Sequence, residues 1–437
     1  MLMKKINIAL VIIFLTQCAR GQNGMTRQDS IAARFDDVKA AMGKAEKLWE
    51  RNLYGPILLV NPFTRQAYAN YADSTGVLKQ EGPIFTGTLP PKTIIANASI
   101  RWGGVDWAMI LLPFLPPDPK GQINLFAHEL FHKAQAPLRF RFVETNNNHL
   151  DQKDGRIFLR LELEALKKAL HATSITDMRS HLTSALTFRS YRHLLYPGSD
   201  TTENWLELNE GIAEYTGMII AERDKQEALG YFDRKLNEFL AYPTYVRTFA
   251  YRTISAYGYL LHDTNEYWNK EITTQTNLSD YFRQAFTITL PTDIRAAIDS
   301  LIEHYHGNAI ITEETAREEG KKKRIAEYNQ KFIELPHLTI RFERKSVSFD
   351  ARNILPLGDN GIVYPSMKAS DVWGVLTVES GALMSSDRTS VTVSMPLKML
   401  ANNVFGDGWS LQLTEGYTEV KDDTSSNYKL IKKEGNK

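Results

Sequence analysis

The chain lacks three features that would narrow its function at once: paired cysteines, a large net charge and a long apolar run. Cys18 is its only cysteine, so no disulfide can form within the chain and the apolar core has to stabilise the fold. Lys and Arg total 52 against 51 for Asp and Glu, a net charge of +1, which gives no global field to attract nucleic acid. No apolar run reaches the roughly 20 residues of a membrane-spanning helix. We therefore expect no nucleic-acid partner and no transmembrane helix.

The first residues have the pattern of an export signal. "MLMKK" is basic, "INIALVIIFLT" is an apolar run of secretory length, and "QCARGQ" is a polar exit with small residues. Cleavage after Gly21 would make residues 1–21 a signal peptide. The alternative is a sequence resembling a bacterial lipoprotein box, which would place a lipid anchor at Cys18. Both interpretations predict an exported protein that is periplasmic or secreted, or a membrane-anchored lipoprotein.

The rest of the chain predicts an α+β fold. Residues 28–51 have the apolar spacing of an amphipathic helix, and four strand-like segments follow at 55–62, 65–72, 92–100 and 106–116. Helical patterns occupy about 123–135, 156–172, 176–195, 202–223, 225–241, 247–263, 278–287, 291–306 and 313–331. From Leu335 onward, alternating apolar residues and glycine-containing turns predict a separate antiparallel β module.

The segment "HELFH", residues 128–132, has two histidines four residues apart. On a helix they share one face, so His128 and His132 can bind one metal ion. Glu129 lies one step round the helix and suits a general base better than a ligand. The alternative is a core helix that happens to contain two histidines. A third ligand decides between them, because a catalytic zinc site normally has three protein ligands and one open position.

A second segment, "NWLELNEGIAEYTGM" at residues 204–218, supplies carboxylates. Glu207, Glu210 and Glu214 fall at i, i+3 and i+7, which places them along one stripe of a helix. A merely solvated acidic face is the alternative. Because apolar and aromatic residues occupy the remaining surface of this helix, a buried and functional role is favoured.

"HELFH" followed by "NEGIAEY" resembles the motifs of the gluzincin metallopeptidases, the group of thermolysin and aminopeptidase N. The resemblance implies that His128, His132 and Glu210 bind Zn²⁺, that Glu129 is the catalytic base, and that Glu214 orients a ligating histidine. The substrate would be a peptide or protein. "HELFH", "HLDQKDGR" and "WGVL" together are also similar to an exported bacterial family with no assigned chemistry.

The resemblance also implies a domain plan. Residues 22–332 would form a zincin-like domain, with a small mixed sheet and a mainly helical C-terminal subdomain. The β-rich domain at residues 333–437 is the module that the alternating pattern predicts. Residues 133–209 separate His132 from Glu210, much further than in those families. We therefore expect a helical insertion at about 140–200, folded as an antiparallel hairpin beside the site.

Further residues are candidates for roles around the metal. The helix at 251–263 follows the third ligand, and Tyr257, with Tyr251 as second choice, would stabilise the oxyanion. The segment 106–116 would be an edge strand that pairs with an extended substrate. His149 and Asp151 are expected in a polar loop that precedes a helix capped by Asp154. The alternative is that they line the cleft or bind a second ion.

Two other functions remain open at this level. One is a zinc-binding scaffold that keeps the peptidase fold without proteolysis. The other is a zinc hydrolase that acts on a different amide or an ester. The β module does not decide between them, since its alternating tryptophans are typical of sheet core.

Overall fold

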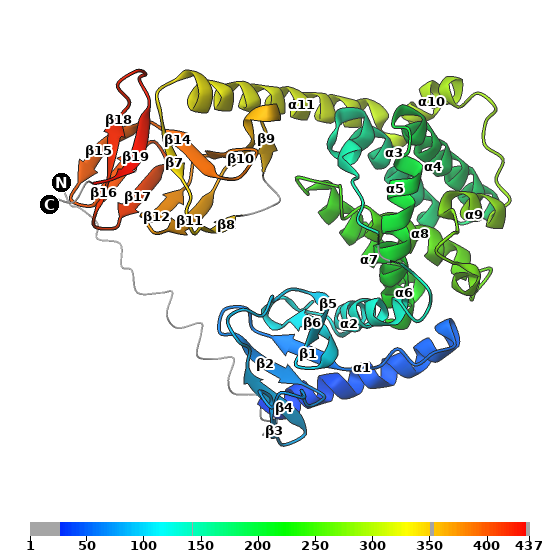
Figure 1. Cartoon of the computed structure of the whole chain (residues 1–437). Coiled ribbons are helices and arrows are strands. Elements are labelled where there is room, and N and C mark those ends of the chain that lie inside the picture. The colour runs from blue at the N-terminus through cyan, green and yellow to red at the C-terminus, as the bar shows by residue number, and fades with distance from the viewer. Residues whose placement is uncertain (1–26, 142, 350–353, 434–437) are drawn as a thin grey trace, which may run out of the picture.

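The computed structural model describes residues 27–141, 143–349 and 354–433 (Figure 1). The predicted signal peptide, residues 1–21, and Cys18 lie outside these ranges. The described chain is a mixed α+β protein with three sheets, and most of its strands lie toward the C-terminus. The expected α+β class is therefore confirmed. Within the described residues, no helix is both long enough and apolar enough to cross a membrane.

An N-terminal sheet follows the first helix, α1 (Arg27–Trp49). Its strands are β1 (Ile57–Val60), β2 (Gln66–Ala69), β3 (Lys79–Glu81), β4 (Ile84–Thr88), β5 (Ala98–Trp102) and β6 (Val105–Leu111). The order is β3-β4-β2-β1-β6-β5. β1 and β6 are parallel and the other pairs are antiparallel, so the sheet is mixed, as predicted.

Both faces of this sheet are covered, which explains the nearly continuous apolar run in β1. Ile57 and Leu59 belong to the main core, together with residues of the surrounding helices, whereas Leu58 and Val60 belong to a smaller cluster on the opposite face. Successive strand residues point to opposite faces. All four are therefore fully buried, and the short strand is held from both sides.

The position of β6 corrects one prediction. The segment 106–116 was expected to be an edge strand, but β6 lies between β1 and β5 and is hydrogen-bonded to both. β5 forms the edge instead. The predicted strand at 92–100 overlaps only the first three residues of β5, because residues 92–97 are not extended strand. β3 and β4 were not predicted, since their short and mostly polar sequences give little periodic signal.

Helices make up the middle of the chain. They are α2 (Pro119–Gln135), α3 (Lys153–His171), α4 (Ile175–Leu195), α5 (Ser199–Leu206), α6 (Ile212–Ile220), α7 (Lys225–Leu240), α8 (Ala250–His262), α9 (Leu278–Ala285), α10 (Ile294–Ile302) and α11 (Gly307–Asn329). Their ends lie within four residues of the predicted ranges, except that α11 begins six residues earlier than predicted and that α5 and α6 were predicted as one helix. The predicted helix at 202–223 is interrupted, because a π-helical turn, η4 (Glu207–Gly211), separates α5 from α6.

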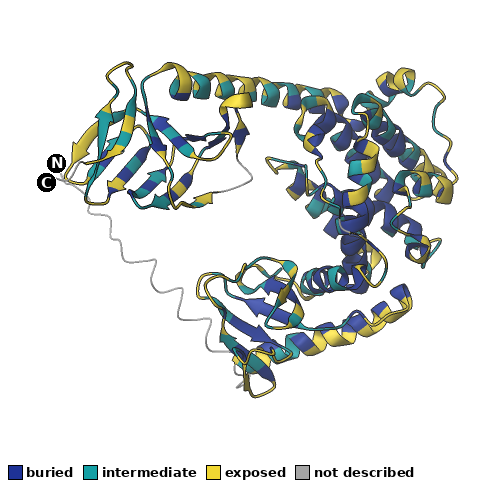
Figure 2. Cartoon of the chain, viewed as in Figure 1, coloured by how far each residue is buried: buried dark blue, intermediate teal, exposed yellow. Residues whose placement is uncertain are grey.

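The segment between the two motifs contains a helical hairpin. α3 and α4 pack along each other and are joined by residues 172–174, so they run antiparallel. α3 also contacts α8 and α11. Figure 2 shows the buried residues gathered in this helical region, whereas α11 carries few of them.

The C-terminal module consists of two sheets that share one apolar core. One has the order β18-β19-β7-β14-β13-β10-β9 and the other the order β15-β16-β17-β12-β11-β8. Every pair is antiparallel except β19 with β7. Trp373 and Trp409 are buried in the shared core, as their alternating positions predict. The strands are β7 (His337–Arg341), β8 (Ser346–Phe349), β9 (Leu355–Pro356), β10 (Ile362–Tyr364), β11 (Met367–Asp371), β12 (Gly374–Val378), β13 (Ala382–Met384), β14 (Ser390–Ser394), β15 (Pro396–Leu400), β16 (Asn403–Gly406), β17 (Trp409–Leu413), β18 (Tyr417–Lys421) and β19 (Tyr428–Lys432).

Helix α11 joins this module to the helical region (Figure 1). Near its start, Ile310 packs in the main core and Glu314 is buried. A π-helical turn, η7 (Gln330–Glu334), follows α11, and Phe332 of this turn packs with Leu355 and Val363 of the module. The helix is thus anchored at both ends, and it corresponds to the helix predicted at about 313–331.

Two glycines allow α6 and η4 to approach their neighbours closely. A Cβ on Gly217 would lie 2.4 Å from the carbonyl oxygen of Asn124 in α2, and a Cβ on Gly211 would lie 2.7 Å from Cβ of Ile254 in α8. Real Cβ atoms do not approach other atoms so closely. The backbones of α2 and α6 can therefore be adjacent only because position 217 has no side chain.

We predict that Gly217→Ala lowers the melting temperature, because the new methyl group pushes α6 away from α2. Overpacking of this kind costs about 1–3 kcal/mol. Gly230→Ala is the matched control, since it lies in helix α7 with no atom within 4 Å of its Cβ position, and helix propensity favours the alanine. Equal melting temperatures for the two variants would contradict the close approach.

Candidate metal centre

Helix α2 presents the first motif. Asp118 caps the helix by accepting a hydrogen bond from the backbone N of Gly121 at 2.6 Å, and Pro119 is its first residue. Phe126, Leu130 and Phe131 are fully buried in the main core and fix the orientation of the helix. The motif side chains therefore project from the helix toward η4 and α6.

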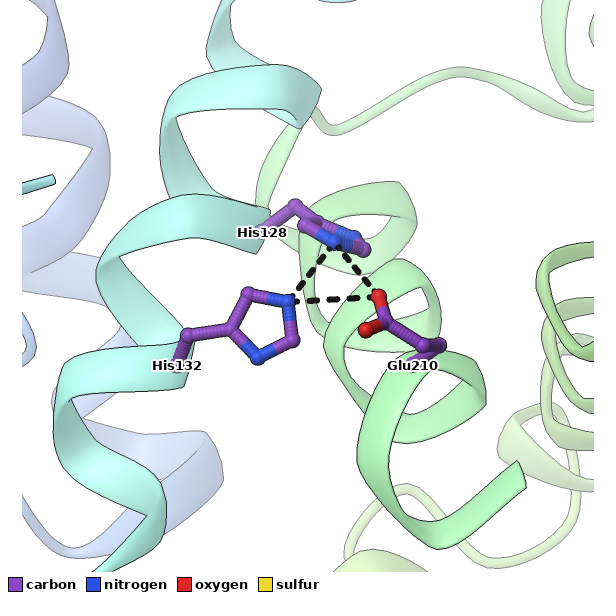
Figure 3. A group of neighbouring side chains, drawn as sticks. All are labelled: His128, His132 and Glu210. Atoms are coloured by element: carbon purple, nitrogen blue, oxygen red, sulfur yellow. Dashed lines mark hydrogen bonds and ion pairs between the residues drawn. The ribbon is translucent and has the colours of Figure 1, made fainter. Parts of the chain in front are cut away.

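His128, His132 and Glu210 meet as predicted (Figure 3). The Nε2 atoms of the two histidines are 3.0 Å apart, and Oε2 of Glu210 lies 3.4 Å from Nε2 of His128 and 3.3 Å from Nε2 of His132. These are the only His, Cys, Asp or Glu side chains among the described residues that cluster in a metal-binding arrangement. Glu210 therefore lies beside the two histidines although residues 133–209 separate the motifs in the sequence.

The surroundings fix which nitrogen of each imidazole carries hydrogen. Nδ1 of His132 lies 2.9 Å from Oε1 of Gln135, and Nδ1 of His128 lies 3.2 Å from Oε2 of Glu214. Oε1 of Gln135 can only accept, so Nδ1 of His132 bears hydrogen and Nε2 of its neutral ring carries the lone pair. The contact of Glu214 with His128 is a close ion-pair distance without hydrogen-bond geometry, but a carboxylate at this distance still favours hydrogen on Nδ1 of His128 and a lone pair on Nε2. Two lone pairs and a carboxylate oxygen facing one another repel unless a cation lies between them.

The donor set fits zinc. Imidazole and carboxylate are zinc ligands, with bonds of about 2.0–2.2 Å, and ligands arranged in a tetrahedron at this distance are roughly 3.3–3.5 Å apart. The distances of 3.3 and 3.4 Å to Glu210 agree with this spacing, and the 3.0 Å between the histidines is slightly shorter. Three ligands leave one position open, which is the arrangement of a catalytic site.

Glu129 lies beside this cluster but is not part of it. It is 5% exposed, and its Oε2 atom has no hydrogen-bond partner among the described residues. Burial raises the pKa of the Glu129 carboxyl, although the two histidines act to lower it. A buried carboxylate with a free oxygen and a raised pKa is suited to accept a proton.

In the metal-free state the cluster retains a proton. Burial lowers the pKa of His128, but its contacts with Glu210 and Glu214 outweigh burial and raise this pKa to about 10. Burial raises the pKa of the Glu214 carboxyl, whereas the contact with His128 brings it down to about 2. A metal ion would displace that proton, since a ligating histidine is neutral.

The position of Tyr257 differs from the prediction. Its hydroxyl donates to Oε1 of Glu162 at 3.1 Å, it is fully buried, and its ring stacks on Phe282. Tyr251, the second choice, lies at the metal cluster instead: its hydroxyl donates to Oε2 of Glu210 at 2.5 Å and its ring stacks on His128. The two tyrosines are six residues apart, so they occupy different faces of α8.

Glu207 points away from the metal cluster, although it was predicted on the same stripe as Glu210 and Glu214. Its carboxylate binds Arg189 of α4 through two hydrogen bonds of 2.7 and 2.9 Å. Glu207 and Glu210 both lie in the π-helical turn η4, whose wider turn changes the spacing expected of an α-helix. Glu207 therefore connects the segment that carries Glu210 to the α3–α4 hairpin.

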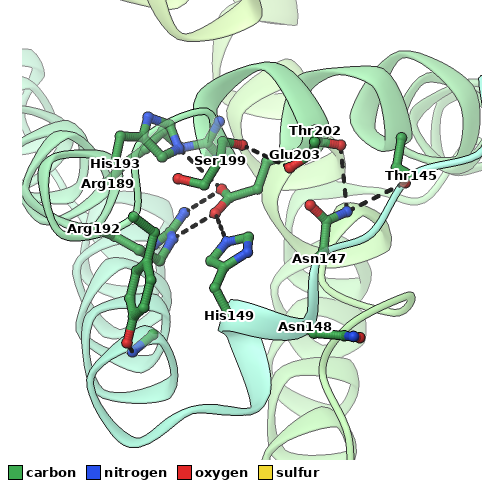
Figure 4. Close-up of polar contacts among 12 residues, drawn as sticks. Thr145, Asn147, Asn148, His149, Arg189, Arg192, His193, Ser199, Thr202 and Glu203 are labelled. Atoms are coloured by element: carbon green, nitrogen blue, oxygen red, sulfur yellow. Dashed lines mark hydrogen bonds and ion pairs between the residues drawn. The ribbon is translucent and has the colours of Figure 1, made fainter.

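This contact belongs to a buried ion-pair network, part of which is shown in Figure 4. Arg189 also donates to Glu162 at 2.7 Å, and Arg192 donates to Glu162 at 2.8 Å and to Glu203 at 2.6 Å. These side chains are at most 1% exposed. The network joins α3, α4, α5 and η4, so the hairpin is bound rigidly to the helix that carries Glu210.

His149 and Asp151 have structural roles. Nε2 of His149 lies 2.7 Å from Oε1 of Glu203 (Figure 4), and Asp151 accepts hydrogen bonds from the hydroxyl of Thr244 and the backbone N of Tyr245. Neither residue belongs to a metal-binding cluster of the described chain. Asp154 lies in the first turn of α3, but its side chain does not cap the helix.

Three side chains around the site were not predicted from the sequence. Gln135 follows His132 by three residues, a spacing that could have identified it as a neighbour on the helix. Tyr231 of α7 donates to Oε1 of Glu214 at 2.6 Å. Arg189 and Tyr231 come from helices that no local spacing connects to the motifs, so no signal in the sequence identified them.

No protein-family model, no curated protein and no solved structure matches the chain. The interpretation of the cluster therefore depends on its own geometry and on the two motifs.

We predict that Arg189→Met destabilises the protein by about 3–5 kcal/mol, because Glu162 and Glu207 lose a buried partner. Urea unfolding followed by circular dichroism measures the loss. Arg283→Met is the control, since Arg283 pairs with Asp280 on the surface and exposed pairs contribute at most about 1 kcal/mol. Equal stability of the two variants would show that the network does not hold the hairpin.

Proposed function

We propose that the protein is an exported zinc metallopeptidase of the gluzincin type. The observation that carries the proposal is the convergence of His128, His132 and Glu210 beside a buried carboxylate, Glu129, that has a free oxygen. The N-terminal pattern supports export, with residues 1–21 removed or with a lipid anchor at Cys18. Both motifs contribute to one set of two imidazoles and one carboxylate, and this set of donors favours zinc over other metals.

A zinc ion held by these three residues would supply Lewis-acid activation of a water molecule and of the scissile carbonyl. Glu129 accepts the proton of the attacking water and passes it to the leaving amine. Its raised pKa suits this exchange, because the same carboxyl has to take up a proton and release it. The low exposure of Glu129 excludes bulk water, which strengthens the electrostatic effect of its charge.

Tyr251 is the donor that the geometry favours for the oxyanion. Burial and the neighbouring Glu210 raise the pKa of its hydroxyl well above the usual range. The hydroxyl therefore stays protonated at neutral pH and can donate a hydrogen bond to developing negative charge. Its contact with Oε2 of Glu210 keeps it next to the ligand atoms.

The free edge of β5 is the proposed position of the substrate backbone. β5 pairs with β6 on one side only, and both strands pack against α2. An extended peptide can add to such an edge by main-chain hydrogen bonds. This role, first expected of residues 106–116, belongs to β5 because β6 is internal.

Two other functions use the same site. A zinc-binding scaffold would keep the ligands but would need no free base, so the partnerless oxygen of Glu129 argues against it. A hydrolase of another amide or an ester would use the same residues. The edge strand favours a peptide, because main-chain pairing recognises an extended polypeptide.

We predict that Glu129→Gln abolishes hydrolysis of unstructured casein but retains one equivalent of zinc, because the residue is a base and not a ligand. Peptide release and metal content are measured on the same preparations, with a chelator-treated wild type in parallel. Retained hydrolysis would remove Glu129 from the mechanism. Loss of zinc from the variant would instead make Glu129 a ligand.

We predict that Tyr251→Phe lowers the turnover of the zinc-loaded protein by about 10²–10³-fold, the usual effect of removing one oxyanion donor. Tyr257→Phe removes a hydroxyl of the same helix that contacts only the ion-pair network, and it should affect stability more than turnover. If Tyr257→Phe reduces turnover as strongly as Tyr251→Phe, the assignment of Tyr251 is wrong.

A further inference from the structure

Gln135 connects the two elements that carry the metal ligands. It is the last residue of α2 and is 8% exposed. Its Oε1 atom lies 2.9 Å from Nδ1 of His132, and its Nε2 atom donates to the backbone oxygen of Asn209 at 2.7 Å. Asn209 lies in η4, directly before Glu210. One amide side chain thus contacts a ligating histidine and the segment of the third ligand.

The chemistry of these partners fixes the orientation of the amide. The backbone oxygen of Asn209 can only accept a hydrogen bond, so the NH₂ group of Gln135 has to face it. The carbonyl oxygen of Gln135 then faces His132 and requires hydrogen on Nδ1. The lone pair of His132 is consequently on Nε2, the atom that faces His128 and Glu210. The backbone oxygen of Asn209 thus determines the tautomer of His132, because it fixes which way the amide of Gln135 points.

The same contact orients Glu210. The side-chain amide of Asn209 donates to Oε1 of Glu210 at 3.2 Å, which leaves Oε2 facing the two histidines. Because Gln135 fixes the backbone of Asn209, it also positions the side-chain amide that donates to Glu210. His132 and Glu210 thus depend on one side chain for their relative position.

An amide is better suited to this position than a carboxylate. The carboxylates of Glu129, Glu210 and Glu214 already surround the cluster, so another negative charge would raise the repulsion. A glutamate at 135 could still accept from His132, but it would place an oxygen against the backbone oxygen of Asn209. The contact between α2 and η4 would then become repulsive.

We infer that Gln135 is a positioning residue of the metal centre: it sets the tautomer of His132 and locks η4 against the end of α2. The inference rests on the proposed zinc site and adds to it the residue that fixes its geometry. Residues that orient metal ligands typically change metal affinity by 10–100-fold when they are replaced.

Gln135→Met tests the inference, because methionine keeps the length of the side chain and removes both hydrogen bonds. The measurements are zinc affinity, by competition with a chromophoric chelator, and the visible absorption of the cobalt-substituted protein, which reports ligand geometry. We expect zinc affinity to fall about 10–100-fold and the cobalt bands to shift. Gln135→Glu should also bind zinc more weakly than wild type.

Gln122→Met is the matched control. Gln122 lies on the same helix and makes two side-chain hydrogen bonds, one from Arg34 and one to the backbone oxygen of Pro116 at 2.9 Å. It should alter the melting temperature without changing zinc affinity or the cobalt spectrum. If the wild type binds zinc and Gln135→Met binds it with an affinity within twofold of the wild type, the inference about Gln135 is wrong but the proposed zinc site stands. A wild type that binds no zinc would overturn the proposed site as well.

Discussion

Two imidazole lone pairs and a carboxylate oxygen that face one another impose the central constraint on this molecule. Within a largely buried cluster such an arrangement is stable only with positive charge between the acceptors. Gln135 favours it by accepting a hydrogen bond from the outer nitrogen of His132, and the carboxylate of Glu214 favours it by its short distance to the outer nitrogen of His128. The proton that His128 retains without metal is the simplest form of that charge. A divalent cation satisfies all three acceptors at once, which is why we interpret the cluster as a metal centre.

The rest of the fold brings two distant segments to this point. Gly217 permits α6 to lie against α2, and Gly211 permits η4 to lie against α8. The α3–α4 hairpin makes up most of the chain between His132 and Glu210, and the ion pair of Arg189 with Glu207 fixes it. The inserted hairpin therefore does more than separate the motifs, because its buried charges hold the helical segment that carries Glu210. Tyr257 takes part in this network and not in the metal cluster.

Much of this architecture was predictable from local sequence. The helices have strong periodicity, and the three residues of the candidate metal cluster follow from the spacing within "HELFH" and from the acids of "NEGIAEY". The failures have physical causes. A π-helical turn redirects Glu207, and Tyr251 and Tyr257 lie six positions apart on α8, so they are on different faces of that helix. Strand β6 became internal because β5 pairs outside it, and pairing partners are not encoded in a single strand. Long-range partners such as Arg189 and Tyr231 depend on tertiary packing, which short-range patterns do not contain.

Anomalous diffraction at the zinc absorption edge, from crystals grown with one equivalent of zinc, tests the central claim most directly. The account predicts a single strong anomalous peak about 2.0–2.2 Å from Nε2 of His128, Nε2 of His132 and Oε2 of Glu210. A peak at another place in the molecule, with none between these three atoms, would contradict the assignment of the cluster as a metal centre.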